Sequence, residues 1–322
     1  MAQTPFPINP ALVAIAVQYA NINRIARGYI ADRVAVRMPV AKSIFRYKEY
    51  KIEEAFQVVD NQVDRLGRLN EIVRSSTETL GETKDYGILE KVPFRDEAMA
   101  AGEGLFPLKA QAVRDVLDVN QLNREIRVSA FTMSTASYQT GYFSDRTAGV
   151  KWSDFGASDP VADVIDAAAA MLIPPNVGVT SRRVMNILRR HPKIAVALGG
   201  SLNSGKYYSE QEVATALGLE RIEVGNTLKQ TSKRGQSLTT GNIWPDSFAM
   251  HYQGPMNDAG QGLDLGATNF LATFQWGGII SGENPYRPGE MGLWGGVGVY
   301  TGESLVEKRV MPYAGYLFAN VL

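Results

Sequence analysis

Apolar residues recur every three or four positions along the stretch that follows Pro107. The recurring positions are Val113, Val116, Leu117, Val119, Leu122, Ile126, Ala130 and Met133, with charged residues between them. This spacing predicts one helix opened by Pro107, because a residue in the first helical turn needs no backbone N–H. A helix that continues to about Ser137 is about 45 Å long at 1.5 Å per residue. That length is typical of a structural spine rather than of a compact enzyme domain.

Four shorter helices are predicted from apolar spacing or from capping residues. The N-terminal one covers Ala11–Ile25, where apolar residues again have helical spacing. The other three run from Asp159 with Pro160 to Leu172, from Thr180 or Ser181 to about Arg190, and from Ser209, which forms a capping box with Glu212, to Leu217. Gly218 follows the last of them, as is common after a helix.

Strands are predicted where residues alternate or form short apolar runs. Three such segments precede residue 240, namely Val34–Val40, Lys193–Leu198 and Ile222–Gly225. The remainder is rich in glycine and aromatic residues and predicts strands over Ile243–Trp244, Phe248–Tyr252, Phe274–Ile280, Trp294–Tyr300 and Val310–Tyr316. The chain is therefore expected to be a mixed α+β protein.

The segment from Ile44 to about Ala101 is polar and weakly patterned. Ile44–Lys48 and Tyr86–Val92 have the composition of two extended arms, and the charged stretch Asp60–Lys84 between them has few large apolar residues. Such a stretch is too long for an ordinary loop, since loops above about 12–15 residues are uncommon in compact domains. Such a segment is expected either to hang free or to become ordered against a neighbouring molecule.

Charge and composition exclude several classes of function. The chain has 33 basic and 33 acidic residues among 322, so nucleic-acid recognition is not expected to be its main role. The absence of cysteine excludes disulfides and thiolate chemistry and fits folding in a reducing cytoplasm. The N-terminus lacks the pattern of a signal peptide, and no apolar run there is long enough to cross a membrane.

Two glycine-rich motifs resemble nucleotide-binding loops but depart from them. Gly200–Lys206 has the spacing of a phosphate-binding loop, but Tyr207 stands where a magnesium-binding hydroxyl is required, and the next helix cap comes only at Ser209. Gly296–Gly302 misses the dinucleotide fingerprint by one residue and lies within strand-like sequence. A surface turn and a pair of close-packed strands are the expected structures.

The titratable residues suggest no catalytic or metal site. His191, before Pro192, is expected to place an imidazolium at the negative end of a helix, and His251 is expected in a strand. Carboxylates are plentiful, but none is expected to pair inside an apolar context that would shift its pKa. Arg182, Arg183, Arg189, Arg190 and Lys193 form the densest basic cluster, for which a solvated helix face is favoured over DNA contact. The sequence predicts no catalytic residue, cofactor-binding residue, cofactor or metal ligand, and hence no enzyme.

Several segments, in order, resemble the major capsid proteins of tailed bacteriophages that have the Hong Kong 97-like fold. They are Asn123–Val128, Lys151–Asp154, Asp159–Asp163, Pro175–Val179, Val184–Ile194, Ser209–Ala214, Leu217–Gly225 and Ile243–Ala249. These are structural patterns without a catalytic signature, and the resemblance covers roughly residues 20–320. It implies an α+β fold with an N-terminal arm (1–45), an extended loop (46–104), a peripheral domain with the spine helix (105–160), an axial domain (161–250) and strands that return to both (251–322).

The same resemblance implies a function and partners. The subunit would self-assemble through hexamers and pentamers into an icosahedral shell that encloses double-stranded DNA without sequence specificity. It would reside in the virion after assembly in the host cell cytoplasm, with scaffold, portal and decoration proteins as further partners and no membrane contact. The chain starts almost at the arm, so a separate scaffold protein is expected. Two alternatives remain: an encapsulin-like nanocompartment protein that packages an enzyme cargo, and a nucleotide-dependent enzyme that uses Gly200–Lys206.

Overall fold

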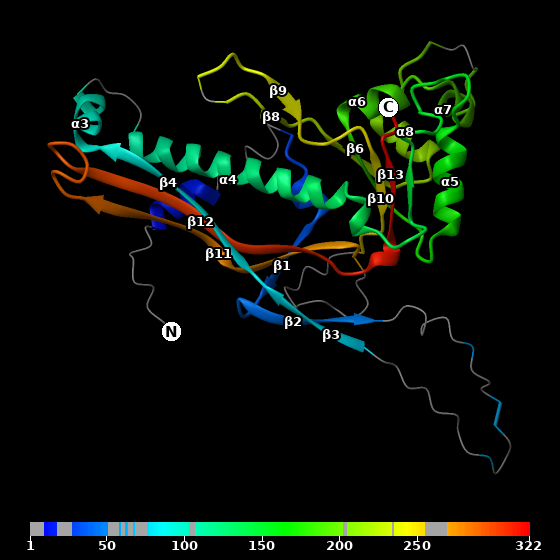
Figure 1. Cartoon of the computed structure of the whole chain (residues 1–322), viewed down its shortest axis with the longest axis horizontal. Helices are drawn as coiled ribbons and strands as arrows, with labels where there is room; N and C mark the ends of the chain where they lie inside the picture. Colours follow the sequence, from blue (N-terminus) through cyan, green and yellow to red (C-terminus); the bar gives the residue numbers. More distant parts are fainter. Residues whose placement is uncertain are drawn as a thin grey trace.

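A computed structural model describes most of the chain. The described residues are 10–17, 28–50, 58, 62–63, 67, 76–102, 107–201, 205–233, 235–254 and 269–322. The molecule is elongated, with a long helix and a sheet along most of its length and a cluster of helices and a second sheet at one end (Figure 1). The fold is mixed α+β, as the sequence predicts.

A four-stranded sheet runs beneath the long helix in Figure 1. Its strands, in spatial order, are β1 (Val36–Val40), β11 (Leu271–Tyr286), β12 (Gly296–Arg309) and β4 (Lys84–Pro93). β1 is parallel to β11, and the other two pairs are antiparallel. The sheet therefore joins strands from both ends of the chain. Its two longest strands shift register between Trp276 and Ile280, where Gly277 has a φ of 70°.

The predicted spine helix is α4 (Leu108–Thr132), with Pro107 as its N-cap. It ends earlier than expected, because a short 3₁₀ turn, Thr135–Ser137, replaces its last predicted turn. The apolar spacing is nevertheless explained, since Ala112, Val113 and Leu117 pack on Val297 and Val299 of β12. A short helix, α3 (Phe94–Gly102), connects β4 to this spine.

The second sheet has five strands and two covered faces. In spatial order they are β5 (Phe143–Asp145), β13 (Gly315–Ala319), β10 (Phe248–His251), β6 (Val177–Ser181) and β7 (Arg221–Gly225). Four helices enclose the core that contains Phe248 and Met250: α5 (Pro160–Ala170), α6 (Arg182–Leu188), α7 (Pro192–Ala197) and α8 (Glu210–Ala216). Ala249, which alternates with them along β10, joins a second core with Trp244.

Most local predictions are confirmed and three are wrong. Asp159, Ser181 and the Ser209–Glu212 capping box start helices as expected. Lys193–Leu198, predicted as a strand, forms α7 instead, because His191 caps it, Pro192 occupies its first turn and its apolar residues fill the helical core. Ile243–Trp244 lies outside any strand. Val310–Tyr316 contains a 3₁₀ turn at Pro312–Ala314, so the final strand starts only at Gly315.

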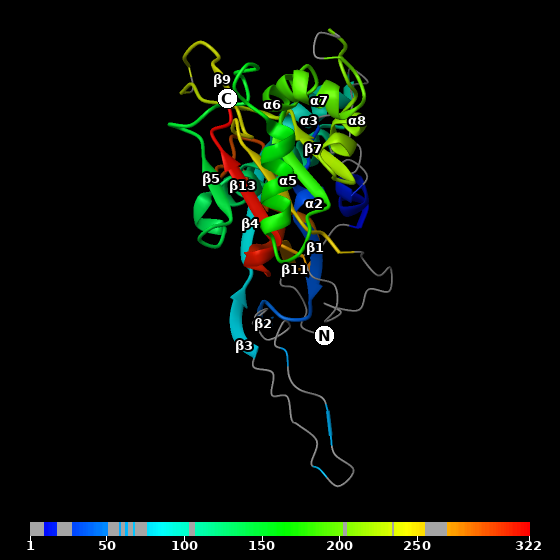
Figure 2. The same cartoon turned by 90° about the vertical axis from the view of Figure 1, so that its right-hand side faces the viewer.

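Two hairpins project from opposite sides of the molecule. β2 (Ile44–Tyr50) pairs with β3 (Ser76–Glu82), and β8 (Leu228–Gln230) pairs with β9 (Thr240–Asn242). In both views β2 and β3 lie in the lower half of the picture, and the β8–β9 hairpin lies near the top (Figures 1 and 2). Both predicted extended arms are confirmed as strands, since Ile44–Lys48 lies in β2 and Tyr86–Val92 lies in β4. Much of Asp60–Lys84 lies outside the described residues.

The predicted N-terminal elements are described in part. Residues 10–17 are helical, and residues 18–25 of the helix predicted over Ala11–Ile25 lie outside the described residues. A short helix, α2 (Ala31–Val34), then leads directly into β1. The strand predicted over Val34–Val40 is confirmed from Val36 onward.

Candidate functional site

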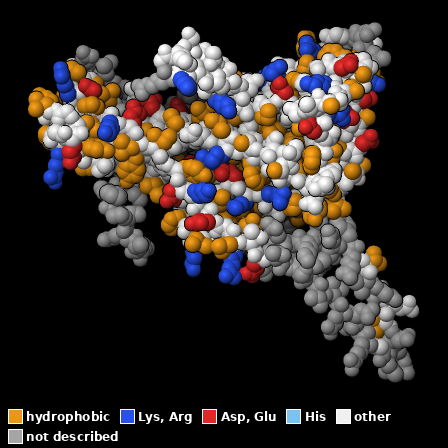
Figure 3. Space-filling model, viewed as in Figure 1, with side chains coloured by type: hydrophobic (Ala, Val, Ile, Leu, Met, Phe, Trp, Pro, Cys, Tyr) orange, Lys and Arg blue, Asp and Glu red, His pale blue; other side chains and the backbone are white. Residues whose placement is uncertain are grey.

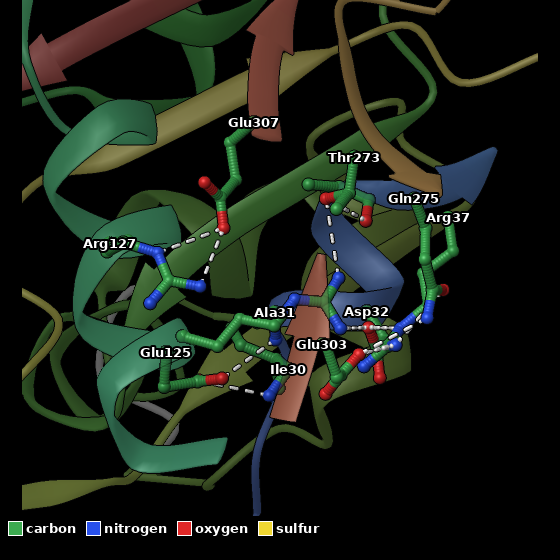
Figure 4. A network of polar contacts seen from close by, with 12 residues as sticks. Ile30, Ala31, Asp32, Arg37, Glu125, Arg127, Thr273, Gln275, Glu303 and Glu307 are labelled. Atoms are coloured by element: carbon green, nitrogen blue, oxygen red, sulfur yellow. Dashed lines mark hydrogen bonds and ion pairs between the residues drawn. The ribbon is translucent and has the colours of Figure 1, made fainter. Parts of the chain in front are cut away.

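Two charged residues of the spine helix lie inside the protein. Arg124 is 4% exposed and Glu125 is fully buried. They lie where α4 crosses α2 and the four-stranded sheet, and Figure 4 shows the polar groups around them. The expectation that no carboxylate pairs inside an apolar context that would shift its pKa is wrong for Glu125, because its partners come from segments far away in the sequence.

The first part of this network is a chain of ion pairs. Arg37 of β1 donates to Asp32 at 2.8 Å and pairs with Glu303 of β12, and Gln275 of β11 bridges Arg37 and Glu303 (Figure 4). Arg124 also pairs with Asp32. Burial lowers the pKa of Arg37, but Asp32 and Glu303 raise it by more, so the net shift is upward. Burial dominates for Arg124 and lowers its pKa.

The second part is the carboxylate of Glu125, which accepts three hydrogen bonds. The backbone N–H groups of Ile30 and Ala31 donate at 3.0 and 2.9 Å, and the indole Nε1 of Trp244 donates at 2.8 Å. Burial raises the pKa of Glu125, and these hydrogen bonds oppose that shift only in part. The side chain thus satisfies the first backbone donors of α2 and holds α2 against α4.

The network fixes the N-terminal segment to the body of the subunit. It joins α2 and β1 to α4, β11 and β12 through groups with little access to water. Close by, Arg127 pairs with Glu307 at 3.2 Å and stacks at 3.8 Å over the ring of Tyr86. Buried charges that lose one partner are costly, so this arrangement strongly favours a single position for α2 and β1.

An exposed apolar cluster lies at the end of the molecule where β11 turns into β12. Leu293 is 85% exposed and Trp294 is 66% exposed. Phe94 and Met99 are exposed on α3, whose first residue, Phe94, donates its backbone N–H to the carbonyl of Gly295 in the same turn. We call these four residues the apolar tip; hydrophobic side chains gather at this end in Figure 3. Gly289, Gly292 and Gly295 all have positive φ, so the turn that presents Trp294 is built from backbone conformations that glycine favours.

The face of the four-stranded sheet opposite α4 is only partly covered. Phe45 and Tyr47 of β2 pack on Phe274, with ring centroids 4.6 and 5.6 Å apart. Further along the same face is an open groove of about 440 Å³, whose apolar walls include Leu89, Trp276, Ile280 and Tyr300. Leu89 and Tyr300 are register partners, so they point to the same side of the sheet.

The structure places the two glycine motifs in separate structural contexts. Of Gly200–Lys206, residues 202–204 lie outside the described residues. Lys206 is 3.6 Å from Glu212 and 4.9 Å from the ring of Tyr208, and the nearby helix starts only at Glu210. Gly296–Gly302 lies within β12, where a Cβ on Gly302 would be 2.8 Å from the carbonyl of Tyr86. Close strand packing therefore explains the second motif.

His191 has a structural role that differs from the expected one. Its Nδ1 accepts a hydrogen bond from the N–H of Lys193, which caps α7, and its Nε2 lies 3.0 Å from the hydroxyl of Ser158. The side chain is buried, and burial lowers its pKa. The expectation of an imidazolium at a helix C-terminus is wrong, because a neutral ring is needed to accept at the start of the next helix.

The basic cluster on α6 and α7 is engaged in contacts within the subunit. Its members bind as follows: Arg182 to Glu210 at 2.5 Å, Arg183 to Asp246 at 2.6 Å, Arg189 to the carbonyl of Tyr208 at 2.6 Å, Arg190 over the ring of Phe155, and Lys193 to Asp159 at 3.4 Å. These contacts neutralise most of the charge locally. Each cation of the cluster therefore has a partner within its own subunit.

The described residues contain no group of three or more histidine, aspartate or glutamate side chains placed to hold a metal ion. Within the same part of the chain, no helix has the length and apolar character that crossing a membrane requires.

Comparison with known proteins places this fold in a family. No protein-family model matches the chain. The major capsid protein of Pseudomonas phage JBD67 is 33% identical over all 322 residues, which cover 99% of that protein. The chain belongs to the phage major capsid proteins. This membership favours a capsid protein over the nanocompartment and enzyme alternatives, and it identifies a structural protein of the virion rather than an enzyme.

Solved structures agree on the fold. A phage-related protein from Bordetella bronchiseptica RB50 superposes with a TM-score of 0.72 at 17% identity, covering 99% of both chains. The capsid structure of the cyanophage P-SCSP1u gives a TM-score of 0.53 at 8% identity, covering 89% of this chain and 86% of that one. The capsid protein therefore has the Hong Kong 97-like fold that its sequence resembles.

Proposed function

We propose that this capsid protein assembles through hexamers and pentamers into a closed icosahedral shell around double-stranded phage DNA. Assembly would take place in the host cell cytoplasm, with scaffold, portal and decoration proteins as further partners. The apolar tip is the observation that carries this proposal. A tryptophan and a leucine held exposed on a glycine-built turn are costly in water and typical of residues that anchor an interface.

The uncovered groove on the sheet supports the same proposal. The subunit's own β2 covers the part of this face around Phe274, and the groove beside Trp276 and Tyr300 stays open. We propose that residues 46–104 act as the extended loop and cover a neighbour, after an N-terminal arm at residues 1–45. Residues 105–160 would form the peripheral domain and 161–250 the axial domain, with strands of 251–322 shared between them.

The test is negative-stain electron microscopy of the purified full chain, expressed alone and with any neighbouring scaffold gene. Closed shells, tubes or ring-shaped capsomers are expected. The double variant Leu293→Ser/Trp294→Ser should keep its thermal unfolding temperature, since both side chains are mostly exposed, and should lose assembly. Leu238→Ser is the matched control, because Leu238 is also mostly exposed, at 71%, but lies on the β8–β9 hairpin. This control variant should assemble normally. A small, discrete species under both conditions would refute the shell role.

A further inference from the structure

The β8–β9 hairpin has a charge composition unlike the rest of the chain. From Asn226 to Pro245 the sequence contains three cations, Lys229, Lys233 and Arg234, and no acidic residue, in a chain that carries 33 acidic residues in 322. The same stretch holds six serine or threonine residues and two glutamines. Lysine, serine, threonine and glutamine are the side chains that contact phosphate oxygens in nucleic-acid complexes.

The hairpin presents these groups on a shape that its own hydroxyls hold in place. The backbone N–H and the hydroxyl of Thr231 both donate to the carbonyl of Thr239, at 2.9 and 3.2 Å, and the two threonine hydroxyls lie 3.1 Å apart. Ser232 accepts from Gln230 and from the N–H of Thr239. Gly235, with a φ of 88°, allows the turn that the Gln236 N–H to Lys233 carbonyl bond closes.

The two described lysines of the hairpin differ from the cations elsewhere on this side of the molecule. Lys233 is exposed and Lys229 is half-buried. Within the part of the chain that the structure describes, neither forms an ion pair, whereas all the cations of α6 and α7 are engaged in contacts within the subunit. The positive charge of the hairpin is therefore available to an anionic partner.

The position of the hairpin separates it from the surfaces proposed for subunit contacts. It stands beyond α4, while β2 and β3 lie on the other side of the four-stranded sheet (Figures 1 and 2). A shell subunit has one face toward the packaged genome and one toward the exterior. A surface that carries positive charge and hydroxyls, with no acidic side chain in its sequence, is complementary to the phosphate backbone.

We propose that the β8–β9 hairpin is the surface through which the shell contacts its packaged DNA, as a sequence-independent phosphate-binding element on the inner face. This inference rests on the proposed shell role. Each hairpin supplies only a few phosphate contacts, so binding by one subunit is weak and sensitive to salt. Many copies on one closed surface hold the genome without the large net positive charge that would interfere with assembly.

The first test measures binding of a short fluorescein-labelled DNA duplex of arbitrary sequence to the unassembled full chain, over a series of sodium chloride concentrations. The variant Lys229→Ala/Lys233→Ala should bind several-fold more weakly, with a salt slope lower by about two. The control Lys42→Ala/Lys84→Ala removes two exposed lysines at the opposite side and should bind like the wild type. Absent binding by the wild type, or equal binding by both variants, would overturn the proposal.

The second test uses lysine acetylation read by mass spectrometry on DNA-filled particles and on particles after DNA release. Protection of Lys229 and Lys233 only in filled particles is the expected result. Protection in both states would show a contact between copies of the chain, and protection in neither would place the hairpin outside; each result overturns the proposal. Electron microscopy of the same samples tests shell formation separately, so a failure of DNA contact can be told from a failure of assembly.

Discussion

Glu125 and Trp244 are joined by a hydrogen bond of 2.8 Å from the indole Nε1 to the carboxylate, across 119 positions of sequence. Glu125 also holds the start of α2, and the ring of Trp244 lies against Gly225 of β7. This pair therefore links the N-terminal segment, the spine helix and the five-stranded sheet at one buried point.

Removing the Glu125 carboxylate should destabilise the subunit strongly. In Glu125→Ala three buried donors lose their acceptor, and the expected loss is about 3–5 kcal/mol of unfolding free energy. Urea unfolding followed by tryptophan fluorescence measures it. Gln111→Ala, at an exposed position of the same helix, should change stability by less than about 0.5 kcal/mol. If the two variants lose similar amounts of unfolding free energy, the Glu125 carboxylate does not stabilise the subunit.

A side chain at Gly225 should be poorly tolerated because Trp244 occupies the space. A Cβ there would lie 2.1 Å from Cδ1 of the indole, and a shift of that ring would disturb its bond to Glu125. Gly225→Ala is expected to cost about 1–3 kcal/mol, as overpacking of a core does. Gly278→Ala is the control, since nothing lies within 4 Å of the added atom. If Gly225→Ala and Gly278→Ala have the same midpoint of thermal unfolding, the close packing of Trp244 on Gly225 is contradicted.

Stability should fall in mild acid through His251. This side chain is 1% exposed, and within the described residues neither ring nitrogen has a hydrogen-bond partner. Burial, with a smaller effect of Arg221, lowers its pKa from 6.5 to about 4. The unfolded chain then binds a proton between these two values while the folded chain does not, so unfolding free energy decreases as pH falls from 6.5 toward 4.

The measurement is urea unfolding at pH 7 and pH 4.5. The His251 contribution to the loss is expected to be about 2–3 kcal/mol, at 1.36 kcal/mol for each pKa unit. His251→Phe keeps an aromatic ring against Phe270 and should lose less stability over the same interval. If wild type and variant lose equal stability, another group is responsible for the acid sensitivity.

The sequence alone determined the elements whose cause is local. Asp159 with Pro160, and Ser209 with Glu212, start helices because the capping groups lie within three residues of the donors that they satisfy. The apolar spacing after Pro107 determined the spine helix for the same reason, since helical neighbours are three or four positions apart. The ordered series of such segments also carried the resemblance to phage capsid proteins.

Only the tertiary structure decided the features whose partners are distant in the chain. The Glu125 network joins groups 94–119 positions apart, and Arg37 meets Glu303 across 266 positions, so no local pattern marks either. Lys193–Leu198 has both kinds of cause: His191 and Pro192 start the helix locally, and burial of Ile194 in the tertiary core favours it over a strand, with which a short apolar run is equally compatible. Exposure is likewise a tertiary property. Nothing in the local sequence distinguishes Trp244 from Trp294, but packing buries Trp244 and leaves Trp294 66% exposed.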